Sequence, residues 1–346
     1  MRTSRSRCLS AVWQPPRPTR PGAGSIVVVG AHIQGLFMRV SALPKEGESV
    51  LGHSFEEPVD GGRATNQAIC AARLGAPVRF LTVLGNDERG SRWRQLLELE
   101  GIHMGWAITS TKPTDIGFVL LAPNGTAAVA TAMEANRELD GSAVRGMRDA
   151  FEDAAVVLCQ LEAPDEAAVA AFAAARDVGA PTILNPSPPQ NLTEELLSLT
   201  DLLIANVHEA SWLLGVSAPP PVLASRLQRA CPGTCVIVTA GAAGAYACDP
   251  SGRELAVPAP AVDVVDKNGA GDAFAGALAV RLRAGDTLEA AIRYAVIAAS
   301  LSVTRTGSAA AYPGAAEVAT AVRAAAMTAA AAEAAAVARL PSYAGT

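Results

Sequence analysis

Residues 25–30, Ser-Ile-Val-Val-Val-Gly, set the pattern that decides the fold. Their β-branched side chains follow one another without a polar interruption, which is typical of a parallel strand buried on both faces. Apolar runs of the same kind recur along the chain at residues 79–84, 156–161, 182–184, 202–205 and 236–239. We therefore expect a sheet built mostly from parallel strands.

Helix-like segments lie between these runs, and each of them stops at a glycine. They cover residues 64–74, 91–100, 164–178 and 208–214, followed by Gly75, Gly101, Gly179 and Gly215. A glycine just past the last helical turn adopts the left-handed cap conformation without strain. Strands that alternate with helices predict an α/β fold with helices on both faces of the sheet.

Two stretches break this alternation. Residues 49–59 and 116–131 are predicted as strand pairs without a helix, with Pro123, Asn124 and Gly125 as the turn of the second pair. A small β layer beside an α/β body can act as a lid that excludes water from the strand ends. An ordinary edge hairpin gives the same pattern, so the sequence leaves both interpretations open.

The composition excludes several classes of protein. The chain has 346 residues, 33 acidic and 28 basic side chains, a formal charge of −5, and half of its residues are apolar. A basic nucleic-acid binder and a disordered chain are both inconsistent with these values. No apolar stretch reaches the roughly 18 residues of a membrane helix, because Arg323, Glu333 and Arg339 interrupt the Ala-rich C-terminus. We expect a globular protein that binds neither nucleic acid nor membrane.

Cysteine usage and the chain ends complete this outline. Cys231 and Cys235 are the one closely spaced pair among six cysteines, which is a weak zinc signal, and free thiols suit a cytoplasmic location. Residues 1–24 carry five arginines, no acid and several prolines, so we expect a disordered Arg/Pro-rich tail or a misplaced start codon. One domain is expected over residues 25–330, followed by an Ala-rich C-terminal extension over 331–346.

The most informative segment is residues 266–276, Asp-Lys-Asn-Gly-Ala-Gly-Asp-Ala-Phe-Ala-Gly. Its glycines stand directly before an apolar helical run, where bare backbone N–H groups and the helix dipole favour an anion. Asp272 falls in the first helical turn, beside the predicted phosphate or oxyanion site. Helix capping alone would explain Asp272, but capping does not require the glycines.

A second segment, residues 60–67, Asp-Gly-Gly-Arg-Ala-Thr-Asn-Gln, also opens a helix with paired glycines. One interpretation is a tight turn with a solvated Arg63. In the other, Gly61 and Gly62 let a hydroxylated ligand approach the backbone while Arg63 and Asn66 hydrogen-bond it.

Together, these segments resemble the two signatures of the ribokinase-like, or PfkB, carbohydrate kinases. Those signatures are Gly-Gly-x-x-x-Asn near the N-terminus and Asp-Thr-x-Gly-Ala-Gly-Asp near the C-terminus. Intermediate matches follow in the right order: Gln160-Leu161-Glu162, Asn206-x-x-Glu209 and Thr239-x-Gly241-x-x-Gly244. The resemblance covers about residues 25–330 and is greatest to ribokinase. It implies a three-layer α/β/α sandwich with a mostly parallel central sheet and a small β-sheet lid, its strands at about 36–60 and 113–132.

The resemblance also implies an activity. It is the transfer of the γ-phosphate of ATP to a hydroxyl of a sugar or sugar derivative, and we expect that hydroxyl to be a primary one. Asp272 is similar to the family's general base, and Gly269, Ala270 and Gly271 are similar to its anion hole. The implied ligand-binding residues are Gly61, Gly62, Arg63, Asn66 and Glu162 for the acceptor, joined by the candidates Gln34 and Asp60; Asn206, Thr239, Gly241 and Gly244 for ATP; and Glu209 for Mg²⁺ through water.

Family members often bind a monovalent cation, usually K⁺, beside the anion hole. The matching positions are Asp266, Asn268, Ser302, Arg305 and Gly307, mostly through backbone carbonyls. Lys267 stands where the family has a small residue, usually Thr, and its ammonium would weaken or replace that cation. The sequence leaves a K⁺ site open.

The acceptor site departs most from the family. Ribokinase carries Asn-x-Asp after its first strand, and Ile33 and Gly35 take those two places here. Losing a buried polar partner costs about 1–3 kcal/mol, which argues against ribose as the preferred acceptor. His32, Gln34 and Asp60 are either new polar contacts or surface residues.

Two alternatives to a sugar kinase stay open: a nucleoside kinase of the same family, and a non-catalytic relative that binds a sugar or nucleotide. A nicotinamide-dependent dehydrogenase fails on spacing, since Gly30 and Gly35 do not form Gly-x-Gly-x-x-Gly. The family resemblance further implies a homodimer that forms through the lid strands.

Overall fold

The computed structural model describes residues 14–16, 21–124 and 126–338. Most of the expected disordered tail, residues 1–24, lies outside the described residues. The same holds for Gly125 in the expected lid turn and for the last part of the C-terminal extension.

A nine-stranded sheet forms the centre of the molecule, and all its strands except β14 run parallel to one another. The apolar run that opens the pattern becomes β1, between β10 and β4. In spatial order the strands are β15 (Glu254–Val257), β14 (Ala245–Cys248), β13 (Cys235–Thr239), β12 (Leu202–Asn206), β11 (Thr182–Asn185), β10 (Ala154–Gln160), β1 (Ser25–Val29), β4 (Val78–Leu81) and β6 (Ile102–His103).

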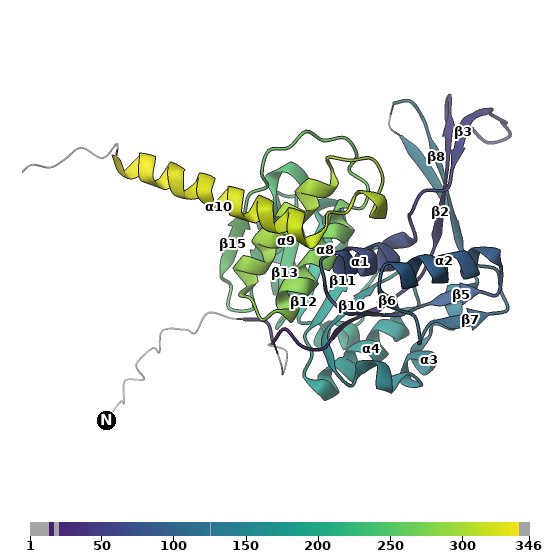
Figure 1. Ribbon diagram of the computed structural model, residues 1–346, viewed down its shortest axis with the longest axis horizontal. Helices are drawn as coiled ribbons and strands as arrows, with labels where there is room; N and C mark the ends of the chain where they lie inside the picture. The colour runs from purple at the N-terminus through teal and green to yellow at the C-terminus, as the bar shows by residue number, and fades with distance from the viewer. Residues whose placement is uncertain (1–13, 17–20, 125, 339–346) are drawn as a thin grey trace, which may run out of the picture.

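Helices cover both faces of this sheet (Figure 1). Alternate strand residues point to opposite faces, so Val28 packs into one apolar core while Val27 packs into the other. One face carries α1 (Gly62–Arg73), α2 (Glu88–Leu99), α8 (Ala270–Arg283), α9 (Leu288–Ser302) and the start of α10 (Ala315–Ala338). The other carries α3 (Gly141–Arg145), α4 (Asp165–Val178), α5 (Glu194–Ser198), α6 (Val207–Leu214) and α7 (Pro220–Ala230). The predicted three-layer α/β/α architecture is confirmed.

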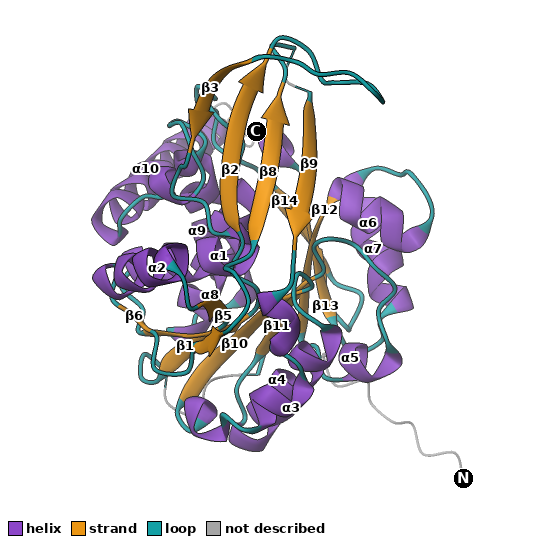
Figure 2. Cartoon of the chain, turned by 90° about the vertical axis from the view of Figure 1, so that its right-hand side faces the viewer, coloured by secondary structure: helices purple, strands orange, loops and turns teal. Residues whose placement is uncertain are grey.

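A separate four-stranded sheet stands over the carboxyl ends of the central strands (Figure 2). Its order is β3 (Gly52–Glu56), β2 (Gln34–Val40), β8 (Ile116–Leu121) and β9 (Ala127–Ala132). The prediction of a strand pair within residues 49–59 is wrong, because that stretch holds only β3, which pairs with β2. The inner pair, β2 and β8, runs parallel, and each outer strand is antiparallel to its neighbour.

Local signals in the sequence fix several element ends. Gly179 and Gly215 adopt the left-handed conformation after α4 and α6, with φ of 71° and 64°. The single strand expected over residues 79–84 divides at Thr82. Its first half is β4 in the central sheet, and its second half, β5 (Val83–Gly85), pairs with β7 (Ile108–Ser110) in a two-stranded sheet.

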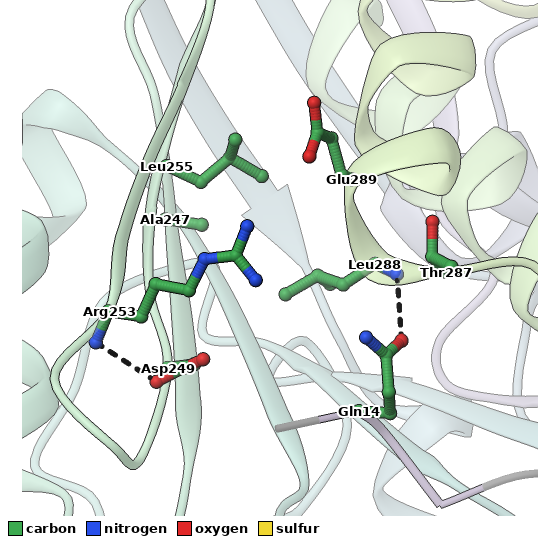
Figure 3. A pocket seen from close by; sticks show the side chains of 8 residues that line it. All are labelled: Gln14, Ala247, Asp249, Arg253, Leu255, Thr287, Leu288 and Glu289. Carbon is green, nitrogen blue, oxygen red and sulfur yellow. Dashed lines mark hydrogen bonds between the residues drawn. The ribbon is translucent and has the colours of Figure 1, made fainter. Parts of the chain in front are cut away.

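The described N-terminal residues lie against the turn between α8 and α9. The Gln14 side-chain oxygen accepts a hydrogen bond from the Leu288 N–H at the start of α9 (3.4 Å), and Arg283 Nε donates to the Gly24 carbonyl (2.8 Å). Figure 3 shows the small pocket beside this contact, into which Arg253 points. Cys248 of β14 pairs with Val236 near the amino end of β13, so this pocket lies at the edge of the sheet opposite the strands' carboxyl ends.

Within the described ranges, no helix is both long and apolar enough to cross a bilayer.

Candidate active site

A cleft of about 510 Å³ lies between the four-stranded sheet, the carboxyl ends of the central strands and the first turn of α8. Parallel α/β sheets bind ligands at this edge. The lining residues come from both predicted motifs and from the strand ends between them: Gly62, Arg63, Asn66, Glu162, Asn185, Asn206, Glu209, Thr239 and residues 267–272.

The N-terminus of α8 forms the floor of one end of the cleft. Gly269 precedes the helix with φ of 74°, a left-handed conformation in which a side chain is strained. A Cβ on Gly269 would lie 2.6 Å from the hydroxyl of Tyr312, which itself donates to the Gly269 carbonyl (3.1 Å). Because the first N–H groups of a helix lack intrahelical partners, this end of α8 offers hydrogen-bond donors and a positive dipole to an anion.

Asp272 lies in the first turn of α8, half-buried at the cleft wall. Burial raises the pKa of its carboxyl to about 7, and the charges of Glu162 and Asp60 act in the same direction. The positive charge of Arg63 and a hydrogen bond from Gln67 partly oppose this rise in pKa. A carboxylate whose pKa lies near neutrality is suited to general base catalysis at physiological pH.

A chain of buried amides fixes Asp272 from behind. Gln67 Nε2 donates to Asp272 Oδ1 (2.8 Å) and to Asn185 Oδ1 (3.0 Å), while Gln67 Oε1 accepts from Gln160 Nε2 (2.5 Å). These amides come from α1, β11 and β10. Sequence reasoning did not assign Gln67 or Asn185 a role, although Gln67 directly follows the Asn66 of the motif and Asn185 ends a buried strand.

The turn before α1 brings charged groups close enough to Asp272 to act on its pKa. Arg63 binds both oxygens of Glu162, through its backbone N–H (2.9 Å) and through Nη1 (2.5 Å). Burial raises the pKa of Glu162, and the neighbouring Arg63 holds that rise in check. Asp60 Oδ1 accepts hydrogen bonds from Asn66 Nδ2 (3.0 Å) and from the Gly62 N–H (3.3 Å).

Asn206 and Glu209 form a reciprocal capping box at the start of α6. Asn206 Oδ1 accepts from the Glu209 N–H (2.9 Å), and Glu209 Oε2 accepts from the Asn206 N–H (2.8 Å). The Ser187 hydroxyl donates to Glu209 Oε1 (2.6 Å). This pairing fixes the buried Glu209 carboxylate at the cleft, although a helix cap alone would account for it.

The residues present fit a hydrated Mg²⁺ that is shared with a bound phosphate chain. Among the described residues, no three His, Cys, Asp or Glu side chains gather closely enough to hold a metal ion by themselves. Mg²⁺ usually keeps several waters and binds through one or two carboxylates plus substrate phosphates. A single fixed carboxylate, Glu209, opposite the N-terminus of α8 matches that requirement.

The predicted K⁺ positions form two loops joined by one carboxylate. Asp266 Oδ1 accepts from the Asn268 N–H (3.0 Å), and its Oδ2 accepts from the Gly307 N–H (2.9 Å). The Ser302 hydroxyl is engaged with the Ala299 carbonyl, and Arg305 forms an ion pair with Glu317. Backbone carbonyls are therefore the ligands left to a monovalent cation at this place.

The pfkB carbohydrate kinase family model matches residues 23–315 of this sequence. The chain belongs to the pfkB family of carbohydrate kinases. As a pfkB kinase it catalyses ATP-dependent phosphorylation of a sugar.

Curated relatives and solved structures of pfkB kinases agree with this assignment. The chain is 31% identical to the ribokinase of Mus musculus over 318 residues, which is 88% of this chain and 97% of that protein. It is 33% identical over 295 residues to the bifunctional ribokinase/ribose-5-phosphate isomerase A of Fructilactobacillus sanfranciscensis, and spans 54% of its length. The structure of Arabidopsis thaliana ribokinase complexed with ribose and ATP superposes with a TM-score of 0.77 at 28% identity, covering 86% of this chain and 98% of that one.

The fold of this pfkB kinase brings most of the predicted site residues to one cleft, but not all of them. Gln34 does not line the cleft, and its amide donates to Glu57 (3.0 Å). Gly61 supports the turn, since its N–H donates to Asn66 Oδ1 (3.3 Å). Gly241 and Gly244 shape the turn after β13, while Thr239 itself reaches the cleft. The four-stranded sheet supplies Phe37 and Val119 to the cleft and is referred to below as the lid.

Proposed function

We propose that this pfkB kinase transfers the γ-phosphate of ATP to a primary hydroxyl of a sugar or sugar derivative, with Asp272 as the general base. One observation carries the proposal. The Asp272 carboxyl, with its pKa raised to about 7, shares the cleft wall with the exposed N-terminus of α8. A base poised near neutrality and a phosphoryl-binding helix end are the two elements that a phosphoryl transfer to an alcohol needs.

In the proposed reaction, Asp272 accepts the proton of the acceptor hydroxyl as its oxygen attacks the γ-phosphorus. The bond between the γ-phosphorus and the bridging oxygen breaks, so that ADP leaves and the phosphorylated sugar forms. Gly269, Ala270 and Gly271 present the α8 N-terminus to the equatorial oxygens of the transferring group. Such preorganised donors stabilise charge that develops in the transition state.

ATP occupies the other half of the cleft in this proposal, beside Asn206 and Thr239, with the turn at Gly241 and Gly244 shaping its outer edge. Mg²⁺ would be held by Glu209 through water and by the phosphates, where it neutralises negative charge. A monovalent cation would bind the carbonyls of the loops around Asp266 and Gly307. Lys267, which lines the cleft, places a further positive charge close to the phosphates.

The acceptor lies between α1 and the lid. Arg63 and Asn66 lie one turn apart on α1, and Arg63 binds Glu162 just after β10. The space beside the Gly62 backbone is occupied by Ile33 and the Glu162 carboxylate. The inner lid face contributes Phe37, Val119 and Val129. Closing this apolar face over the acceptor would exclude water, which otherwise competes as an acceptor of the phosphoryl group.

Phe37 is the one aromatic side chain among the residues that line the cleft. A nucleobase is bound most strongly by stacking on aromatic rings, so this lining favours a sugar over a nucleoside.

A panel of sugars and nucleosides assayed for ADP release tests the proposal, with wild type compared with Asp272→Asn. We expect ADP release with at least one sugar from the wild type and a loss of at least about 100-fold in the variant. Equal turnover by the two proteins would show that Asp272 is not the general base. Thermal stabilisation by a sugar without ADP formation anywhere in the panel would favour the non-catalytic alternative.

We also infer that the outer face of the lid binds the same face of a second copy of this chain. Successive side chains of a strand point to opposite faces, so Phe118 lies on the outer face of β8 while its neighbour Val119 lines the cleft. Phe118 is 37% exposed and Phe55 of β3 is 50% exposed. Exposed aromatic groups on one face of a small sheet are typical of an association surface.

A further inference from the structure

Asp60 packs against the bare backbone of Gly35 at the junction of the lid and α1. The Gly35 N–H donates to the Asp60 carbonyl (2.8 Å), and the Ile33 N–H donates to the Gly61 carbonyl (2.8 Å). A Cβ on Gly35 would lie 2.8 Å from Phe37 Cε2, 3.3 Å from Asp60 Cβ and 3.4 Å from Asp60 Cγ. The absence of a side chain at position 35 therefore leaves room for both the Phe37 ring and the Asp60 side chain at the cleft wall.

Only one of the two carboxylate oxygens of Asp60 accepts hydrogen bonds from the protein residues described. Its Oδ1 accepts two hydrogen bonds, from Asn66 Nδ2 and from the Gly62 N–H. Its Oδ2 has no hydrogen-bond donor or cation partner among the described residues. Two donors hold the group in one orientation, so Oδ2 is an acceptor whose direction is already fixed before a ligand arrives.

The charge around Asp60 selects against anions. Asp60, Glu162 and Asp272 are three carboxyl groups in this half of the cleft, and Arg63, which binds Glu162, is the cation that faces them. The negative charge of Asp60 acts to raise the pKa of both other carboxyl groups. A ligand that brought a carboxylate or phosphate here would add a further negative charge beside these carboxyl groups, and Arg63 is already bound to Glu162. The other cation that lines the cleft, Lys267, precedes the N-terminus of α8, where the phosphates of ATP are proposed to bind.

Ile33 makes the neighbouring wall apolar. Its Cβ lies 3.3 Å from the position of a Cβ on Gly62, and its Cγ2 lies 3.5 Å from that on Gly117, so it fills the corner between α1 and the lid. Phe37 and Val119 continue this apolar surface across the lid. A ligand hydroxyl directed at Ile33 would lose its hydrogen bonds to water without gaining a partner.

We propose that Asp60 determines the acceptor specificity of this kinase by accepting a hydrogen bond, through Oδ2, from a hydroxyl of an uncharged sugar. Ile33 packs against a carbon of that sugar which carries no hydroxyl. The preferred acceptor is thus a neutral deoxy sugar, and sugar acids are rejected. This inference rests on the proposed function for its reaction, but its binding consequences can be measured without ATP.

Calorimetric titration of 2-deoxyribose, ribose and ribonate into the nucleotide-free protein tests the inference. We expect the wild type to bind 2-deoxyribose at least tenfold more tightly than ribose, and ribonate not measurably. Asp60→Ala should weaken 2-deoxyribose binding at least tenfold. Asp60→Asn, which is nearly isosteric, should also weaken 2-deoxyribose binding. It should reduce the difference in affinity between 2-deoxyribose and ribonate. Ile33→Thr should shift the preference toward ribose.

Glu57→Gln is the matched control. Glu57 is a carboxylate three residues from Asp60 that accepts from Gln34 and does not line the cleft, so its removal should leave the sugar affinities unchanged. Unchanged affinities in both Asp60 variants, or a wild type that prefers ribose or ribonate, would overturn the inference. ADP release with any sugar would still uphold the kinase reaction in that case. Conversely, Asp60-dependent binding without ADP release would contradict the reaction and uphold the site.

Discussion

The carboxyl of Asp272 lies where two opposing influences on its pKa meet. Burial raises the pKa to about 7, and Arg63 opposes that rise. The kcat/KM of the wild type should therefore increase with pH through about 7, because only the ionised carboxyl can accept the hydroxyl proton. A pH profile measures this acid limb, since kcat/KM reports the free enzyme.

Arg63→Gln should move that limb to higher pH, because the opposing positive charge is gone, whereas Arg63→Lys should leave it close to the wild-type position. ATP phosphates also titrate near pH 6, so the shift between variants is the informative quantity. An acid limb at the same pH in Arg63→Gln and wild type would show that Arg63 does not act on the catalytic base.

The raised pKa also predicts a cost in stability. The unfolded chain ionises this carboxyl near pH 3.8, whereas the folded protein keeps it protonated up to about pH 7. Stability contributed by the protonated form is present below pH 3.8 and is lost as the pH rises to 7. Asp272→Asn should therefore match the wild-type Tm at pH 4 and exceed it at pH 8 by at least about 2 °C, the effect of roughly 1 kcal/mol in a domain of this size.

Thermal unfolding at the two pH values, without ligand, checks this expectation. A Tm difference that is the same at pH 4 and pH 8 would contradict the pKa of Asp272 on which it depends. A destabilised catalytic group is a common cost of function.

At the scale of elements, the first turn of α8 depends on the backbone of Gly269. Gly269→Ala adds a Cβ in a left-handed conformation, 2.6 Å from the Tyr312 hydroxyl, so the turn must shift. Misplacing one donor to a transition-state anion costs about 100- to 1000-fold in kcat, and we expect a loss in that range. Gly271→Ala is the control for folding, because its Cβ meets nothing within 4 Å and the Tm should be unchanged. Wild-type kcat in Gly269→Ala would contradict the proposed anion site.

Sequence patterns predicted this element and its neighbours because their signals are local. A helix start after Gly269 and glycine stops after α4 and α6 each depend on residues a few positions apart. The amide chain from Gln67 to Asp272 could not be predicted in this way, since it joins residues 205 positions apart.

The assignment of Gln34 to the cleft shows a different limit. Gln34 and Gly35 are consecutive residues at the start of β2, so their side chains face opposite sides of the lid. Gly35 lines the cleft and Gln34 turns to Glu57. Period-two alternation would have excluded Gln34 once the face of Gly35 was known, but the sequence alone did not say which face was inward.

In the molecule as a whole, the inner face of the lid lines the cleft, whereas its outer face is not covered by the central sheet and its helices. Phe118→Asp should convert a dimer to a monomer, because it places a charge at the centre of the outer lid face. Leu99→Asp is the control, since Leu99 is 89% exposed on α2, away from the lid. Light scattering after gel filtration measures the mass. A wild-type protein that is monomeric at micromolar concentration, or a dimer in Phe118→Asp, would contradict pairing through the lid.

In the proposed reaction, everything depends on Asp272 removing the proton from the acceptor hydroxyl. Single-turnover phosphorylation of the sugar that the panel identifies tests it most directly, with wild type and Asp272→Asn compared at pH 8 under saturating ATP and Mg²⁺, and with sugar binding measured in parallel. We expect the variant to bind the sugar within about threefold of the wild type and to transfer the phosphoryl group at least about 100-fold more slowly. A variant that transfers the phosphoryl group at the wild-type rate would contradict it.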